Sequence, residues 1–209
     1  MRGAFITLEG GEGVGKSTNL ALVEATLRAA GHDVLTTREP GGTALGEQVR
    51  NWILHGDHGN LSAELETLLM FAARSQHLDE VIRPALEQGR WVVCDRFTDA
   101  TFAYQGGGRG ASAGLLRALR DEVQRGLEPD LTLLLDAPLD VGAGRITARV
   151  LDHFEREQRP FFERVRNAYL ALAEQNPERI RIIDAGQSLA GVQRLLAREL
   201  DAFMRRFNP

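Results

Sequence analysis

The sequence predicts an α/β fold, a parallel sheet with helices on both faces, on the strength of two patterns. Short apolar segments alternate with longer amphipathic ones along the chain, which is the order of strand–helix–strand units. The apolar segments are hydrophobic at nearly every position, as in strands that are covered on both faces. The predicted strands are 4–9, 33–37, 91–95, 131–136 and 179–184.

Helices are predicted between and after these strands, where apolar residues recur at helical spacing. They cover 17–30, 43–54, 62–88, 112–125, 139–148, 157–175 and 189–206. Ligands of such sheets bind outside the carboxyl ends of the strands, so residues that follow a strand are the first candidates for a site. We expect residues 1–209 to form a single domain, since this length lies within the range of one domain and no repeat is visible.

The composition indicates a globular protein of the cytoplasm. Hydrophobic residues make up 43% of the chain, and no apolar run approaches the ~18 residues that a membrane span needs. The N-terminus has no signal-peptide pattern, and Cys94 has no second cysteine with which to form a disulfide. The net charge of −4 argues against nucleic-acid or anionic-membrane partners.

A phosphate-binding loop joins the first predicted strand to the first predicted helix. It matches G-x-x-x-x-G-K-[ST], whose glycines turn backbone N–H groups around a polyphosphate at the positive end of a helix dipole. Lys16, the one lysine among 25 basic residues, suits the β- and γ-phosphates, and the Ser17 hydroxyl suits Mg²⁺. We therefore predict that the chain binds a nucleoside triphosphate. The predicted binding residues are Gly10, Gly11, Glu12, Gly13, Val14, Gly15, Lys16, Ser17 and Thr18.

An aspartate at the end of a neighbouring strand is expected to organise the magnesium ion. Asp95 ends the predicted strand 91–95 and Asp136 ends 131–136, and their spacing alone does not separate them. Asp95 is favoured because Arg96 follows it and brings opposite charges together at the strand end. Either aspartate could instead cap the next turn.

Two loops have unusual compositions. Segment 55–60 (HGDHGN) holds two histidines, but a solvated turn is favoured over a metal site because no cysteine or further histidine nearby completes a ligand set. Segment 105–110 (QGGGRG) is predicted to be a flexible loop that carries Arg109, either functional or a hinge.

The basic residues favour a kinase among the proteins that bind a triphosphate. A GTPase would need the base-reading motif N-K-x-D, but the one lysine of this chain already belongs to the phosphate loop. A motor ATPase is disfavoured because the chain shows no basic or extended surface. Guanidinium groups bind phosphate in a bidentate manner, so arginines near the sheet edge indicate a second anionic substrate. These arginines are Arg38, Arg74, Arg96, Arg109, Arg145 and Arg149.

Longer motifs identify a family. They are LEGGEGVGKST (8–18), TREPGGT (37–43), LMFAARSQH (69–77), DRFTDATFAYQGGGRG (95–110), PDLTLLLD (129–136) and LDHFERE (151–157). In these motifs the chain resembles the bacterial thymidylate kinases over nearly its whole length. The resemblance implies the three-layer P-loop nucleoside monophosphate kinase fold, with a five-stranded parallel sheet and a small lid at about 143–156. It also implies a homodimer that transfers the γ-phosphoryl group of ATP to dTMP, giving dTDP and ADP, in dTTP biosynthesis.

The resemblance places four residues at the base of dTMP. Phe71 would stack on the thymine ring, and Arg74 would hydrogen-bond its exocyclic oxygen. Thr101 and Gln105 would lie near the base. For Phe71, and also for Tyr104, the alternative is helix core packing, since LLMFAA is an apolar stripe.

Further residues are assigned to the sugar and the phosphates. Arg38 and Arg96 would hold the acceptor phosphate, Glu12 would lie near the sugar 3′-hydroxyl, and Tyr104 would pack where a ribose 2′-hydroxyl would go. No general base is expected, because a monophosphate at pH 7 is already largely dianionic. The expected catalytic residues are Glu12, Lys16, Asp95, Arg96 and Arg149, with Ser17 and Asp95 at the metal.

The chain departs from the family pattern mainly at the lid. Members supply a transition-state arginine from the phosphate loop or from the lid, and Gly13 occupies the loop position. Arg149, supported by Arg145, is therefore expected to contact ATP, while Thr147 and His153 stand at positions that are often basic. Two alternatives to an active dTMP kinase follow: a slow or regulatory nucleotide-binding protein of this fold, and a kinase for a neighbouring monophosphate such as dUMP.

Overall fold

The computed structural model describes residues 2–56, 61–143, 153–154 and 157–207. Its centre is a five-stranded parallel sheet in the order β2-β3-β1-β4-β5. The strands are β1 (Phe5–Gly10), β2 (Val34–Arg38), β3 (Trp91–Asp95), β4 (Leu131–Asp136) and β5 (Ile180–Asp184). The predicted fold class is confirmed, and each strand agrees with its prediction to within one residue at either end.

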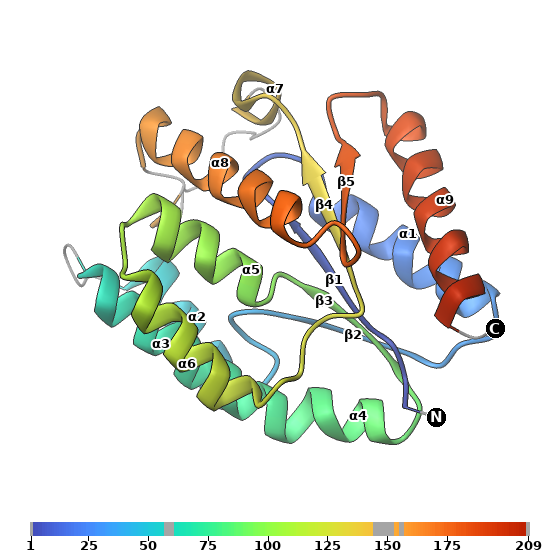
Figure 1. The fold of residues 1–209 in the computed structure, drawn as a ribbon, viewed down its shortest axis with the longest axis horizontal. Coiled ribbons are helices and arrows are strands. Elements are labelled where there is room, and N and C mark those ends of the chain that lie inside the picture. Colours follow the sequence, from blue (N-terminus) through green and yellow to red (C-terminus); the bar gives the residue numbers. More distant parts are fainter. Residues whose placement is uncertain (1, 57–60, 144–152, 155–156, 208–209) are drawn as a thin grey trace.

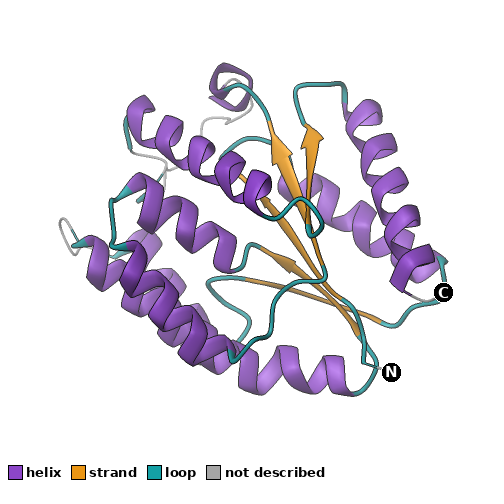
Figure 2. Cartoon of the chain, in the orientation of Figure 1, coloured by secondary structure: helices purple, strands orange, loops and turns teal. Residues whose placement is uncertain are grey.

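Helices cover both faces of this sheet, which gives three layers (Figures 1 and 2). On one side lie α1 (Lys16–Ala29) and α9 (Leu189–Phe207). On the other side lie α2 (Ala44–His55), α3 (Ala63–His77), α5 (Thr98–Thr101), α6 (Ala113–Gln124) and α8 (Arg159–Gln175). The remaining elements are the π-helical η1 (Leu78–Ile82) and η2 (Phe102–Gly108), with α4 (Arg83–Glu87) and α7 (Leu139–Ala143).

The core follows from the alternation of side chains along the strands. Ile6 and Leu8 of β1 pack in the cluster under α1 and α9, whereas Phe5 packs with Phe97 in a cluster on the opposite face. A further cluster joins β4 to α8 through Leu134 and Val165. Both faces of the central strands β1, β3 and β4 are buried, which is why these strands are apolar at nearly every position.

The order of the strands positions the site. β1 is the central strand, and β3 and β4 pair with it on either side. The carboxyl ends of these strands therefore meet, so that Gly10, Asp95 and Asp136 lie at the same edge of the sheet.

The prediction of a flexible loop at 105–110 was wrong, because most of this segment is helical. η2 extends to Gly108 and packs against α8. A Cβ on Gly107 would lie 2.6 Å from the Cβ of Ala168, and one on Gly108 would overlap the ring of Phe161. These glycines permit close helix packing rather than flexibility.

Two predicted helices have different limits in the structure. The helix predicted at 62–88 consists of α3, η1 and α4 in succession, and Pro84 lies in the first turn of α4. The helix predicted at 139–148 begins as α7, and residues 144–148 lie outside the described residues.

Candidate active site

The phosphate-binding loop has the geometry that its sequence predicts. It connects β1 to α1, and Gly15 precedes the helix with φ +88°, a left-handed conformation that glycine adopts without strain. The Lys16 ammonium donates to the carbonyl oxygens of Gly10 and Gly11 at 3.2 and 3.0 Å. Burial lowers the pKa of Lys16, and the Arg96 guanidinium adds to this effect. The ammonium therefore lies over the loop where a polyphosphate would be wrapped.

The loop leaves no room for a side chain at Gly13. A Cβ at this position, where φ is +70°, would overlap the carbonyl of Gly142 in α7. A Cβ on Gly142 would in turn lie 2.6 Å from the carbonyl oxygen of Glu12. The backbones of the two segments are in close contact.

A cavity of about 260 Å³ opens beside the loop, with walls from the loop, the end of β3, α2, α3, α5 and η2. It brings together residues that lie far apart in the sequence. The predicted site residues in its wall are Glu12, Lys16, Ser17, Arg74, Asp95, Arg96, Thr101, Tyr104 and Gln105.

The structure separates the two candidate aspartates. Asp136 accepts two hydrogen bonds from Arg166, from Nε at 2.7 Å and from Nη2 at 2.8 Å. Asp95 lines the cavity with Ser17, and its Oδ1 is buried with no hydrogen-bond partner among the described residues. A buried carboxylate oxygen without a donor fits a cation ligand, since Mg²⁺ is bound through one or two carboxylates plus substrate phosphates.

Arg96 is the centre of a partly buried polar network. Its Nη2 contacts Glu12 Oε1 at 2.6 Å and the Tyr104 hydroxyl at 3.0 Å. Its Nη1 donates to the Gly10 carbonyl at 2.8 Å and to the Tyr169 hydroxyl at 3.2 Å. The Arg96 backbone has φ +67°, a left-handed conformation that costs a non-glycine residue about 1–2 kcal/mol. The site holds this side chain in one geometry at a cost in stability.

Arg74 is buried, with 2% of its surface exposed. Its Nε donates to Glu39 at 2.8 Å and its Nη2 donates to the Thr101 hydroxyl at 2.9 Å. Its Nη1 is buried and has no acceptor within the described part of the chain. Because Arg74 lines the cavity, a ligand carbonyl could satisfy this donor.

A family model described as thymidylate kinase matches residues 8–196. The chain belongs to the thymidylate kinase family. The thymidylate kinase of Methylococcus capsulatus is 58% identical to it over 203 residues, 97% of each chain. That of Pseudomonas syringae pv. tomato is 57% identical over 194 residues, 92% of each chain. The crystal structure of thymidylate kinase from Ehrlichia chaffeensis has a TM-score of 0.75 at 32% identity and covers 98% of this chain and 99% of that chain.

Membership of the thymidylate kinase family confirms the resemblance, the fold and the kinase activity that the motifs imply. It leaves the roles of individual residues to the geometry of the site. Two of the residues predicted from the resemblance do not line the cavity described above.

Phe71 and Arg38 are these two residues. Phe71 is 2% exposed and packs against the Arg74 guanidinium, 4.7 Å from the ring centroid to Cζ. Its neighbour Met70 lines the cavity instead, because it lies one helical turn before Arg74 on the same face of α3. Arg38 is exposed and pairs with Glu47 at 2.9 Å. In this conformation neither Phe71 nor Arg38 reaches the cavity.

Two site residues escaped the sequence analysis. Arg50 of α2 lines the cavity and donates to the Pro40 carbonyl at 3.1 Å, and burial lowers its pKa. Glu9 lies under the site, where it accepts hydrogen bonds from the Phe97 amide and the Tyr169 hydroxyl, both at 2.7 Å. Burial raises the pKa of Glu9 to about 8. The signal for Glu9 was a charged residue inside an apolar strand, whereas nothing distinguished Arg50 from a surface arginine.

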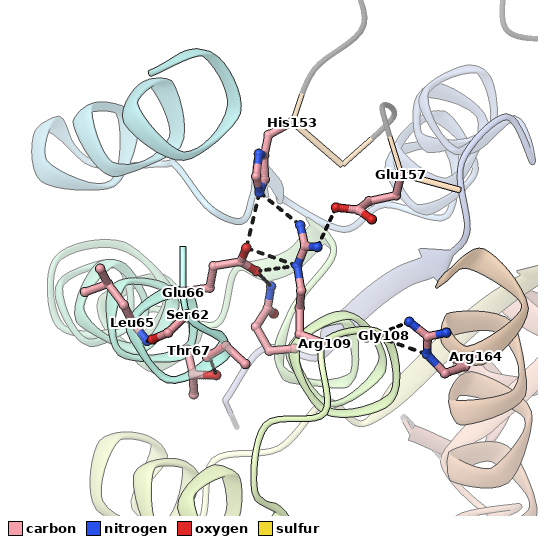
Figure 3. A network of polar contacts seen from close by, with 11 residues as sticks. Ser62, Leu65, Glu66, Thr67, Gly108, Arg109, His153, Glu157 and Arg164 are labelled. Atoms are coloured by element: carbon pink, nitrogen blue, oxygen red, sulfur yellow. Dashed lines mark hydrogen bonds and ion pairs between the residues drawn. The ribbon is translucent and has the colours of Figure 1, made fainter. Parts of the chain in front are cut away.

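The predicted lid lies mostly outside the described residues, and so do Arg145, Thr147 and Arg149. His153 is described, and its Nε2 lies 2.9 Å from Arg109 Nη2 and 3.2 Å from Glu66 Oε1 (Figure 3). These contacts link His153 to α3 and to the residue that follows η2.

No group of three or more histidine, cysteine or acidic side chains in the described residues could hold a metal ion. Of the segment 55–60, residues 57–60 are not described, and His55 ends α2. Within the described ranges no helix is both long and apolar enough to span a membrane.

Proposed function

We propose that this chain phosphorylates dTMP, transferring the γ-phosphoryl group of ATP to give dTDP and ADP, and so supplies dTTP biosynthesis. The observation that carries this proposal is the buried Nη1 of Arg74, a donor in the cavity wall with no acceptor among the described residues. An unpaired buried donor costs about 1–3 kcal/mol. The exocyclic carbonyl of a thymine base would remove that cost.

On the donor side, the phosphate loop would bind the ATP phosphates through its backbone N–H groups, and Lys16 would contact the β- and γ-phosphates. The Ser17 hydroxyl and Asp95 Oδ1 would hold Mg²⁺. When bound, the ion neutralises charge on the phosphates.

On the acceptor side, positively charged groups would align the two phosphates. Arg96 is fixed at the cavity wall by Glu12 and Tyr104, and Arg50 adds a second cation there. Arg38 would bind the acceptor phosphate once its side chain leaves Glu47. Catalysis then consists of alignment and charge neutralisation, without a base.

The walls around Arg74 would suit a pyrimidine deoxynucleotide, which has no 2′-hydroxyl on its sugar. Met70 would contact the ring in place of Phe71, and Thr101 and Gln105 complete the polar side of the pocket. Tyr104 is 5% exposed and its hydroxyl donates to Glu12 at 2.8 Å. Its ring would occupy the space next to the sugar C2′, and Glu12 would lie near the 3′-hydroxyl.

We also propose that the chain forms a homodimer through α2 and α3. Large hydrophobic side chains are exposed on both helices, at 43% for Leu45 and 42% for Trp52 on α2, and at 41% for Leu65 and 49% for Leu68 on α3. Burial of such side chains against a second copy would remove them from water.

The expected location in the cytoplasm remains a prediction.

An ADP-release assay with ATP, Mg²⁺ and a panel of nucleoside monophosphates tests the proposed activity. We expect dTMP to be preferred over dCMP by a large factor, because Arg74 would face an amino group in place of a carbonyl. Preference over dUMP should be about 10–200-fold, since only a methyl group is lost. Nucleotide binding without turnover would support the alternative of a regulatory nucleotide-binding protein. Equal use of dUMP would support the alternative of a kinase for a neighbouring monophosphate.

A further inference from the structure

Glu66 is a buried carboxylate to which neither the proposed mechanism nor the motifs assign a role. It is 0% exposed and lies on α3, four residues before Met70 and eight before Arg74, on the face that looks toward the cavity. A buried charge is retained only where it is paired. Its contacts therefore indicate what it does.

Three groups surround this carboxylate (Figure 3). The Gln105 Nε2 donates to its Oε2 at 3.2 Å. The Arg109 Nε lies 3.1 Å from Oε1 and 3.4 Å from Oε2, and His153 Nε2 lies 3.2 Å from Oε1. Arg109 is itself held by Glu157 and by the face of Phe161, 4.9 Å from the ring centroid. The carboxylate is charge-compensated and fixed.

The contact with Glu66 fixes which end of the Gln105 amide faces the cavity. A carboxylate only accepts hydrogen bonds, so the amide must turn its NH₂ group toward Glu66. Gln105 is 1% exposed and lines the cavity. The carbonyl oxygen is then the amide atom left to meet a ligand.

This orientation distinguishes pyrimidine bases. Thymine presents a carbonyl at C4 beside an N3–H donor, whereas cytosine presents an amino group beside an N3 acceptor. The free Nη1 of Arg74 donates and the carbonyl of Gln105 accepts, which complements thymine and opposes cytosine at both positions.

We propose that Glu66 is a positioning residue that sets base specificity by holding the Gln105 amide with its carbonyl toward the base. The proposal rests on the proposed dTMP kinase activity. Arg109 compensates the charge of Glu66, so that the carboxylate is held by Arg109 as well as by Gln105.

The variant Glu66→Gln tests this proposal. Arg109 donates only, so it claims the carbonyl of the new amide, and the NH₂ group of residue 66 then faces Gln105. The Gln105 amide is expected to turn over and present its own NH₂ group to the base. The ratio of kcat/KM for dTMP to that for dCMP should fall about 10–100-fold. Glu66→Asp, which keeps an acceptor-only carboxylate, should largely preserve the ratio.

Asp99→Asn is the matched control for a merely structural effect. Asp99 is another buried carboxylate, and its hydrogen bonds go to Arg179, at 2.6 Å, and to Thr132 rather than to Gln105. Its loss should lower stability and leave the substrate ratio unchanged. If Gln105→Ala lowers the ratio of kcat/KM for dTMP to that for dCMP and Glu66→Gln leaves this ratio at the wild-type value, the proposal is overturned.

A measurement on the wild-type chain applies even if Glu66→Gln does not fold. In nitrogen-15 NMR spectra of the dTMP complex, the Gln105 side-chain NH₂ protons should exchange slowly and show no contact with the base. Contact between these protons and the base overturns the proposal. If wild type shows no dTMP-dependent ADP release, the proposed function fails, and the orientation of Gln105 is still decided by the same spectra.

Discussion

The carboxylate of Glu12 lies 2.6 Å from the guanidinium of Arg96, measured from Oε1 to Nη2. The pair joins the phosphate loop to the residue that follows β3, and Tyr104 donates to the same carboxylate oxygen at 2.8 Å. The phosphate loop and the end of β3, which are proposed to hold the donor and the acceptor phosphates, are therefore parts of one hydrogen-bonded network. Substrate phosphates would bind next to charges that are already fixed.

The left-handed backbone of Arg96 allows two effects to be separated: that of its guanidinium on activity and that of its backbone conformation on stability. Arg96→Gly and Arg96→Ala both remove the guanidinium and should both lose most activity. Glycine adopts φ +67° without strain, so Arg96→Gly should be more stable than Arg96→Ala by about 1 kcal/mol. Urea unfolding of the two variants measures this difference. Equal stability would mean that the Arg96 backbone is not strained.

Lys16 should be essential for transfer and dispensable for folding. Lys16→Ala removes the ammonium over the loop and should lower kcat by about 100-fold or more. Lys16→Arg should also be poor, because a planar fork does not fit where Nζ reaches the carbonyls of Gly10 and Gly11. ADP release and thermal melting report the two effects. Near wild-type turnover in either variant would contradict the role of this loop.

Glu9 should make the wild-type chain less stable as the pH rises. Its pKa is raised from 4.5 to about 8 by burial, so the unfolded chain loses this proton from about pH 4.5 upward while the folded chain keeps it. Stability therefore falls by up to about 1.4 kcal/mol per pH unit over that range.

Glu9→Gln carries no proton to lose and serves as the comparison. Relative to this variant, wild type should lose about 2 kcal/mol between pH 6 and pH 8. Urea unfolding at several pH values measures the difference. Parallel stability curves would show that Glu9 has an ordinary pKa.

Met70 and Phe71 should have different effects when replaced. Met70→Ala removes part of the cavity wall and should raise KM for dTMP about 10-fold. Phe71→Leu should cost about 1–2 kcal/mol of stability, through lost packing against Arg74, and leave KM nearly unchanged. Steady-state kinetics and unfolding of both variants show which of the two residues contacts dTMP and which one only packs in the core. A large KM effect at Phe71 alone would restore the predicted stacking.

Arg149 is the predicted transition-state cation, with Arg145 in support. Arg149→Ala should lower kcat about 100–1000-fold and change KM for dTMP little, because the contact forms mainly in the transition state. Arg145→Ala should have a smaller effect in the same direction. A change confined to KM would assign Arg149 to substrate binding instead.

Local patterns predicted the parts of the molecule that local physics determines. The phosphate loop follows from residue types at fixed spacing, and strand limits follow from apolar runs. Segment 105–110 was mistaken for a loop because glycine suggests flexibility unless the packing partner is known, here α8. The choice of Met70 over Phe71 depends on which face of α3 meets the cavity. That face is set by tertiary contacts, such as those of Arg74 with Glu39 and Thr101.

The contact between Gly13 and Gly142 restricts the substitutions open to this chain. Any side chain at either position would meet the backbone of the other segment, and shortening a partner side chain cannot relieve the clash because both are already glycine. Placing a catalytic arginine at residue 13 of the phosphate loop would therefore require a shift of α7 as well as the substitution itself. An ancestor with this backbone could gain that charge only from another part of the chain.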